Sequence, residues 1–152
     1  MFMPTVTEFK KYIPAWLDKR RKNPPKGKLY AHYKDFAGPW LWPNFTPQEL
    51  ACRHCGEYYH DPASLDRLQA LRDLLGAPIR INSAHRCAAH NRKVGGVGNS
   101  PHLQIAFDCR CPKKDQIRFV RLAERVGFKG IGMYPARNFI HLDMGKERDW
   151  WG

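Results

Sequence analysis

Two histidines and one aspartate in the C-terminal half of the chain are residues of the types that form zinc sites. Asp108 and His141 lie in two segments, residues 105–111 and 139–145, where apolar and polar residues alternate as in half-buried strands. His102 stands six positions before Asp108. Zinc binds imidazole nitrogen and carboxylate oxygen at about 2.0–2.2 Å, and three protein ligands leave a fourth position to water. If the two segments are neighbouring strands, we expect these three side chains to converge on a Zn²⁺ ion.

A carboxylate beside such a metal would complete the machinery for hydrolysis. The metal lowers the pKa of its bound water towards about 7, and Asp143 is the first candidate for the general base that takes the water's proton. Each residue also has a plainer interpretation when it is taken singly. His141 could be a hydrogen-bonded core histidine, and Asp143 could cap a turn near Gly145.

Two helices are expected beside these strands. Asp61 can cap the first, and its stripe of leucines ends at Gly76. The second is expected over residues 112–126, with Ile117 among the side chains that face the core and Gly127 at its end.

Short strands and one long loop make up the rest of the predicted domain. The strands are expected at residues 78–82, 105–111, 130–134 and 139–145, and the glycine-rich loop at residues 83–101. Strands and helices do not alternate regularly. The pattern therefore predicts an α+β fold, a single domain with a small antiparallel sheet and flanking helices.

Residues 1–45 are predicted to form an N-terminal extension that packs on the core of a domain spanning residues 46–152. An amphipathic helix is expected at residues 5–22, because Pro24-Pro25 would end it. Several aromatic residues follow in a segment that contains prolines: Tyr30, Tyr33, Phe36, Trp40, Trp42 and Phe45. Packing of these rings over the core is favoured over an aromatic platform for a ligand, because so many rings are costly to expose.

The chain is strongly basic, with 26 Lys and Arg against 14 Asp and Glu and a net charge of +12. Such a surface attracts nucleic acid, anionic cell-wall polymers or acidic lipids, or it only keeps the protein soluble. Charged residues interrupt any apolar run near the N-terminus, and no apolar stretch approaches the about 18–20 residues of a membrane span. We therefore expect a protein that is cytoplasmic as synthesised and that reaches any target outside only after release.

Five cysteines form a CxxC pair, Cys52 and Cys55, a CxC pair, Cys109 and Cys111, and the single Cys87. An odd number fits poorly with a complete disulfide framework. The two pairs together could hold a structural zinc ion. Buried free thiols or one disulfide are the favoured interpretation.

The segment SPHLQIAFD, residues 100–108, resembles the S-x-H-x-x-G-x-A-x-D motif of the M15 metallopeptidases, the group of D-Ala-D-Ala carboxypeptidases and LAS-type endopeptidases. Further segments resemble the M15A-like subgroup in order and spacing: FTPQELACRHCG, PIRINSAHRCAAHNRKVGG, and FIHLDMG followed by Trp150-Trp151. The resemblance covers roughly residues 40–152. It implies the LAS or hedgehog-like metallopeptidase fold and a zinc peptidase that acts on peptidoglycan peptides.

The resemblance also implies roles for individual residues. His102 and Asp108 match the first two zinc ligands, and His141 matches the third. Arg86 matches the arginine that binds substrate and stabilises the negative charge of the tetrahedral intermediate. Ser83 and Ser100 are expected to support the ligands or contact the substrate.

Two departures from the family pattern bear on activity. Ile105 stands where we place the motif's glycine, and Asn138 stands three residues before His141, where many relatives carry an acidic catalytic base. The leading hypothesis is a peptidoglycan carboxypeptidase or cross-link endopeptidase, such as a phage endolysin or a virion component. A non-catalytic, zinc-containing wall-binding or structural module is the alternative. A nucleic-acid-binding zinc protein is disfavoured.

Overall fold

The computed structural model describes residues 26–152, so the helix expected at residues 5–22 lies outside the described residues. The helices are α3 (Pro47–Leu50), α4 (Pro62–Leu75), α5 (Ala88–Lys93) and α6 (Gln116–Val126). The strands are β1 (Lys28–Tyr30), β2 (Tyr58–His60), β3 (Ile81–Ser83), β4 (Phe107–Arg110), β5 (Gly130–Tyr134), β6 (Phe139–Asp143) and β7 (Arg148–Trp151). Short 3-10 turns lie at Tyr33–Asp35, Pro101–Leu103, Lys113–Asp115 and Pro135–Arg137. The predicted α+β class is confirmed.

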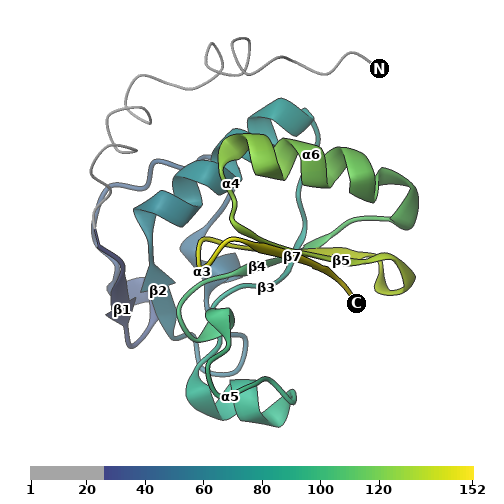
Figure 1. Ribbon diagram of the computed structural model, residues 1–152. Coiled ribbons are helices and arrows are strands. Elements are labelled where there is room, and N and C mark those ends of the chain that lie inside the picture. Colours follow the sequence, from purple (N-terminus) through teal and green to yellow (C-terminus); the bar gives the residue numbers. More distant parts are fainter. Residues whose placement is uncertain (1–25) are drawn as a thin grey trace.

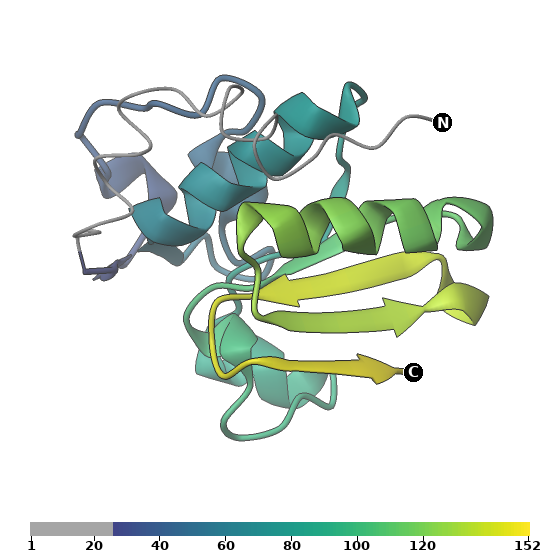
Figure 2. The ribbon, with the colours of Figure 1, turned by 45° about the horizontal axis from the view of Figure 1, so that its top comes forward.

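A five-stranded sheet with the order β3-β4-β6-β5-β7 forms the centre of the fold. Helices α4 and α6 cover one face of this sheet, and α5 lies off the other face (Figures 1 and 2). Neighbouring strands are antiparallel, as predicted, except that β7 runs parallel to β5 at the edge. Strand β7 was not predicted, and neither was the separate two-stranded sheet of β1 and β2.

Helix α4 begins and ends where the sequence predicts. Asp61 is its N-cap residue, although the Asp61 carboxylate accepts a hydrogen bond from the Ser64 hydroxyl rather than from the backbone. Gly76 ends the helix with φ 67°, a left-handed conformation that glycine adopts without steric cost. Three leucines of the predicted stripe are fully buried: Leu65, Leu68 and Leu71. Each contributes about 1.5–3 kcal/mol through the apolar surface it removes from water.

The second helix differs from its prediction in start and phase. Residues Lys113–Asp115 form a 3-10 turn, and α6 begins only at Gln116. Ile117 was expected to face the core, but it is 59% exposed. The buried stripe consists of Phe119, Leu122, Ala123 and Val126, which follow the helical spacing i, i+3, i+4, i+7. Because Ile117 falls outside this stripe, the prediction that its side chain faces the core was wrong.

The region expected to be a loop at residues 83–101 contains helix α5, which begins after Cys87. Glycines at positions 95, 96 and 98 follow shortly after the helix, and these glycines led the sequence analysis to predict a loop. The preceding strand is also displaced, because β3 covers Ile81–Ser83 rather than residues 78–82.

Residues 26–45 bring aromatic side chains to the core. Trp42 and Phe45 are 1% and 2% exposed, and the Trp42 indole donates a 2.8 Å hydrogen bond to Asp66 of α4. The other rings of this segment pack against the same core from positions that are partly exposed. Among the described residues, no helix has the length and apolar character needed to cross a membrane.

Candidate metal centre

One row of residues crosses all five strands on the face opposite α4 and α6. Ser83 pairs with Asp108, Asp108 with His141, His141 with Gly132, and Gly132 with Trp150. Residues that pair across neighbouring strands project from the same face of the sheet. The two alternating segments are therefore neighbouring strands, which is the condition set for convergence, and their pairing places Asp108 beside His141.

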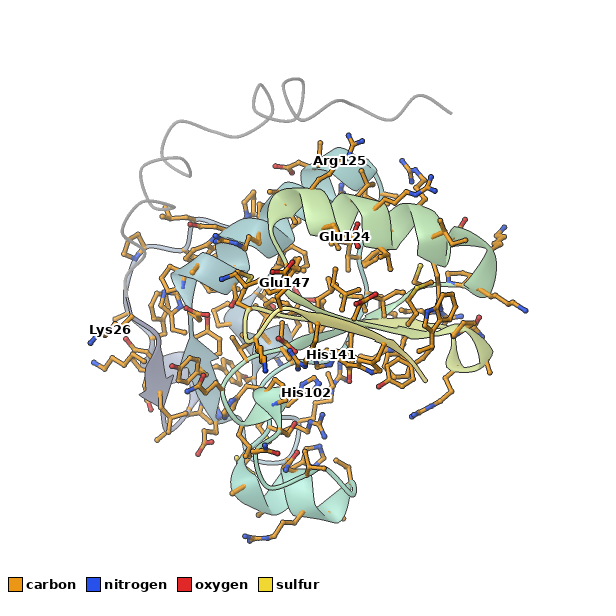
Figure 3. The ribbon with its side chains drawn as sticks, viewed as in Figure 1. Lys26, His102, Glu124, Arg125, His141 and Glu147 are labelled. Carbon is orange, nitrogen blue, oxygen red and sulfur yellow. The ribbon has the colours of Figure 1, made fainter. Side chains whose placement is uncertain are left out.

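His102 approaches this row from the 3-10 turn Pro101–Leu103, and Figure 3 shows it and His141 on the side of the sheet that faces α5. The Ser100 hydroxyl caps the turn by accepting a 3.3 Å hydrogen bond from the His102 amide. His102 Nδ1 lies 2.6 Å from the carbonyl oxygen of Ala84, which can only accept, so Nδ1 carries the proton. The lone pair is therefore on Nε2, which is buried, lies 3.3 Å from Asp108 Oδ1 and has no hydrogen-bond partner among the described residues.

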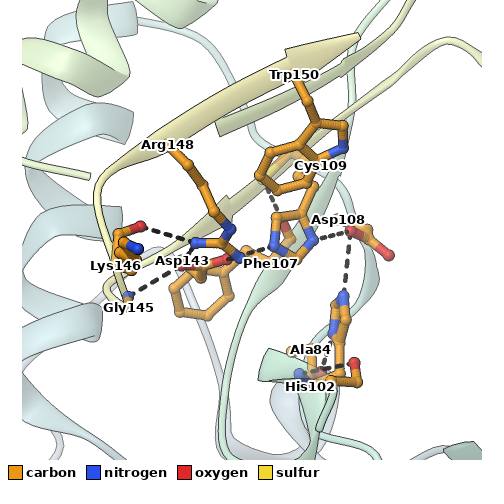
Figure 4. A network of polar contacts seen from close by, with 12 residues as sticks. Ala84, His102, Phe107, Asp108, Cys109, Asp143, Gly145, Lys146, Arg148 and Trp150 are labelled. Atoms are coloured by element: carbon orange, nitrogen blue, oxygen red, sulfur yellow. Dashed lines mark hydrogen bonds and ion pairs between the residues drawn. The ribbon is translucent and has the colours of Figure 1, made fainter. Parts of the chain in front are cut away.

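His141 is oriented in the same way by a carboxylate behind it. His141 Nε2 lies 2.7 Å from Asp143 Oδ2, and Figure 4 shows that Arg148 and the Gly145 amide hold the Asp143 carboxylate in turn. Burial would raise the pKa of Asp143, but the contacts with His141, Arg148 and Gly145 hold it well below its usual range. Burial would lower the pKa of His141, but its contacts with Asp108 and Asp143 raise it. When the ring is neutral, Asp143 accepts the proton of Nε2, and the lone pair then lies on Nδ1, 3.1 Å from Asp108 Oδ1.

Three ligand atoms consequently converge with their lone pairs directed at one another. His102, Asp108 and His141 each offer one ligand atom, and these three atoms lie within 4.8 Å of one another. Burial would raise the pKa of Asp108, but its contacts with both histidines hold the pKa well below its usual range, so this oxygen is anionic. Such a group of acceptors needs a proton or a cation between its members. Two imidazoles and one carboxylate are a set of donors that fits a divalent transition metal such as zinc.

A cavity of about 570 Å³ opens beside these three residues. Four arginines line it: Arg53, Arg86, Arg137 and Arg148. Asp108 is the one carboxylate among the described residues that line the same cavity. The cavity is therefore rich in positive charge and suited to ligands that carry carboxylates.

Arg86, the predicted substrate residue, lies in this cavity. Its amide donates a 2.7 Å hydrogen bond to the His102 carbonyl, which ties the two residues together through the backbone. Its side-chain Nε is buried without a hydrogen-bond partner in the described part of the chain. Burial lowers the pKa of Arg86 and the nearby Asp108 opposes this shift, but a guanidinium stays charged in proteins. A cation with an unused donor is thus available to a ligand. Ser83 and Ser100 also line the cavity.

Asp143 occupies a different place from the one expected of a base in the cavity. It is 2% exposed and lines a neighbouring cavity instead. Asn138 also lies away from the three ligand atoms, in a turn with φ 55° where its side-chain oxygen accepts a 3.3 Å hydrogen bond from the Lys113 amide.

Trp150 and Arg148 of β7 line the same cavity, but neither was given a role in the site from the sequence. The ring centroid of Trp150 lies 5.2 Å from that of His141, and its indole donates a 2.8 Å hydrogen bond to Tyr134. Arg148 bonds both oxygens of Asp143. The alternation of Arg148 and Trp150 with Asp149 and Trp151 was the available signal, but it is too short to identify a strand.

The segment from Ser100 to Asp108 requires a correction to the alignment with the motif. It has nine residues, one fewer than the motif has positions, so between His102 and Ala106 the chain is one residue shorter than the motif, and Ile105 is not a simple replacement of the glycine. Ile105 is buried in the core, and the preceding Gln104 has φ −105° and ψ −100°, outside helix and strand geometry. The shorter connection still brings His102 to Asp108.

Comparison with known proteins decides the family. The sequence profile of the peptidase M15 family matches residues 43–143, which is more than half of the 152 residues. The chain belongs to the peptidase M15 family. It is 32% identical over 100 residues to the peptidoglycan L,D-endopeptidase MepK of Escherichia coli K12, covering 59% of this chain and 54% of the relative.

A second relative supports the same relationship. The probable peptidoglycan L,D-endopeptidase MepK of Haemophilus influenzae is 34% identical over 101 residues, covering 60% of this chain and 54% of that protein. The matched region thus spans about half the length of these curated relatives.

Proposed function

We propose that this chain is a zinc-dependent peptidase that hydrolyses peptide bonds of bacterial peptidoglycan. The observation that carries the proposal is the convergence of one ligand atom each from His102, His141 and Asp108 within 4.8 Å at the wall of a cavity, with His102 Nε2 3.3 Å and His141 Nδ1 3.1 Å from Asp108 Oδ1. These three atoms would hold the zinc ion. When bound, zinc supplies Lewis acidity to a peptide carbonyl and lowers the pKa of a water molecule.

The residues around this group have complementary tasks in the proposed reaction. Arg86 holds a carboxylate of the substrate or the developing oxyanion through its free Nε–H and terminal amino groups. The other three cavity arginines favour peptides that carry carboxylates. The stem peptides of peptidoglycan carry such groups. The similarity to L,D-endopeptidases favours an endopeptidase cleavage over removal of a terminal D-alanine.

Two roles for Asp143 follow from different observations. Its predicted place on the same strand face as His141 suggests the general base. Its contacts support a positioning role, because the carboxylate already accepts hydrogen bonds from His141, Arg148 and Gly145. We propose the positioning role, in which Asp143 fixes the His141 ring and keeps its proton on Nε2.

The test is digestion of purified peptidoglycan, with the released muropeptides identified by mass spectrometry. We expect new amino groups and L,D-cleaved products with the zinc-loaded chain, loss of both after chelation, and recovery on adding zinc. A His102→Ala variant serves as the metal-site control. Release of free D-alanine alone would assign a carboxypeptidase, and no product under any metal condition would refute the peptidase. Clearing of intact walls in a zymogram would extend the proposal to a lytic enzyme such as an endolysin.

A second candidate is a zinc-containing module that binds the wall without cutting it. Asp108 is the one carboxylate that lines the cavity within residues 26–152, and we assign it to the metal, so no second carboxylate is placed to act as a base there. This candidate predicts a stoichiometric metal at the His102 group and sedimentation with walls, but no released amino groups.

A further inference from the structure

Three cysteines from two distant segments meet outside the His102 group. Cys52 and Cys55 lie in the turn that follows α3, and Cys87 is the N-cap residue of α5. Their sulfurs lie within 4.8 Å of one another, and all three are unbridged thiols. The disfavoured alternative, a zinc ion shared by the two sequence pairs, is therefore wrong, since Cys52 and Cys55 gather with Cys87. The favoured interpretation of free thiols agrees with the five unbridged cysteines. Cys109 and Cys111 are instead buried in the core at 0% and 3% exposure.

The turn that carries Cys52 and Cys55 places backbone amides near the Cys52 sulfur. The Gly56 amide donates a 2.8 Å hydrogen bond to the Cys52 carbonyl, and Gly56 has φ 81°, which a side chain would strain. The backbone amides of Cys87, His54 and Cys55 lie near the Cys52 sulfur and lower the pKa of its thiol, against the opposing effect of burial. Burial raises the pKa of the neighbouring Cys55 thiol to about 11. The lowered pKa of Cys52 favours its thiolate, the form that binds metals.

The second segment repeats the spacing of the first with a histidine in the last place. Cys87 and His90 are three residues apart, as are Cys52 and Cys55. The His90 amide donates a 3.4 Å hydrogen bond to the Cys87 sulfur. His90 Nδ1 is buried and has no hydrogen-bond partner among residues 26–152. Burial lowers the pKa of His90, as do the nearby cations, so the imidazole stays neutral and able to act as a ligand.

We propose that Cys52, Cys55 and Cys87, whose sulfurs converge, bind a structural zinc ion separate from the metal at His102, Asp108 and His141, and that the His90 ring turns towards them to become the fourth ligand. Three thiolates and one imidazole are a tetrahedral donor set that closes the coordination sphere and leaves no position for water. On binding, each thiol loses its proton to solvent as the sulfur–zinc bond forms, and no electron is transferred. This site does not depend on the proposed peptidase function.

The ion would hold in place the loop that carries Arg86. Arg86 directly precedes Cys87, and its amide bonds the carbonyl of His102. The His85 amide donates a 3.1 Å hydrogen bond to the Leu50 carbonyl, so the two cysteine-bearing segments are already neighbours. A zinc ion would add a covalent link between them and keep Arg86 at the cavity beside the other metal site.

The decisive measurement uses Co²⁺ as the probe on the full chain, purified with its thiols reduced. Thiolate ligands give Co²⁺ an intense charge-transfer absorption in the near ultraviolet, whereas imidazole and carboxylate ligands do not. We expect this band in the parent protein and in His102→Ala, and its loss in Cys87→Ser. Zinc content should fall from about two ions per chain to about one in either variant. A reduced parent protein without the band would overturn the proposal, as would a native disulfide among the three cysteines.

Matched variants separate the site from general effects on folding. Cys111→Ala removes a buried thiol outside the cluster and should keep the band. His90→Ala should weaken Co²⁺ binding, and His90→Cys should restore it with a stronger band because a fourth thiolate replaces the imidazole. If His90→Ala binds Co²⁺ as tightly as the parent protein, the assignment of the fourth ligand is refuted. The peptidase proposal would fail by a different result, the absence of products from a chain loaded with metal at His102.

Discussion

The chemistry of the candidate site depends on which nitrogen of each histidine carries its proton. The Ala84 carbonyl fixes this for His102, and the Asp143 carboxylate fixes it for His141. In both cases the contact lies behind the ring and leaves the lone pair directed towards Asp108. Residues that only orient a ligand therefore decide whether the group binds a metal at all.

Asp143→Asn tests this dependence. The amide can no longer balance the charge of Arg148 or accept equally well from His141 and Gly145, so we expect zinc affinity and activity to fall together by about 10- to 100-fold. Zinc affinity is measured by competition with a chelator, and activity on peptidoglycan fragments. If activity disappears while zinc affinity stays unchanged, Asp143 is the base and not a positioning residue. Asp149→Asn, on the exposed side of β7, is the control.

Arg86→Lys tests the role of the cavity arginine. Lysine keeps the positive charge but lacks the fork of donors that can bind a carboxylate with two hydrogen bonds, so kcat/KM should fall by about 10- to 100-fold with zinc content unchanged. Arg92→Lys on the exposed side of α5 should have no effect, because Arg92 does not line the cavity. Equal activity of the two variants would exclude Arg86 from substrate binding.

Strand β5 shapes the site at the scale of elements because two of its residues lack a side chain. A Cβ at Gly132 would lie 2.4 Å from the Trp150 ring, and one at Gly130 would lie 2.2 Å from Asp143 Oδ1. The two glycines thus let Trp150 and Arg148 reach across β5 from the edge strand. His141 and Asp143 lie on the other side of β5.

Gly132→Ala is expected to displace Trp150 from His141 and to destabilise the fold by about 1–3 kcal/mol, since the added methyl group has no space. Urea unfolding, followed by tryptophan fluorescence, measures this change. Gly98→Ala is the matched control, because its Cβ would meet no atom within 4 Å. A Gly132→Ala protein as stable as the parent would show that β7 does not pack as described.

Elements with strong local signals could be predicted from the sequence, and those set by tertiary contacts could not. Gly76 and the leucine stripe defined α4, and alternation defined β4 and β6, which carry Asp108 and His141. Strand β7 is only four residues long, and its place beside β5 depends on two glycines whose effect appears only in the sheet. The meeting of Cys87 with Cys52 is a contact between segments far apart in the chain, which no local spacing reveals.

At the scale of the whole molecule, the charge of +12 adds a long-range attraction that no single contact supplies. The Debye length shortens from about 10 Å at 0.1 M salt to about 3 Å at 1 M, so attraction between exposed charges is lost as salt rises. We expect sedimentation of the chain with purified cell walls to fall at least about 10-fold between about 0.05 M and about 0.5 M NaCl.

Removal of the anionic polymers from those walls separates this attraction from recognition in the cavity. Binding at low salt should then fall towards its high-salt value, while cleavage of small soluble muropeptides should stay unchanged because the proposed reaction depends on His102, Asp108, His141 and Arg86. His102→Ala should show the opposite pattern, with normal salt-dependent binding and no cleavage. Binding that is insensitive to both salt and polymer removal would mean that the basic surface does not direct the protein to walls.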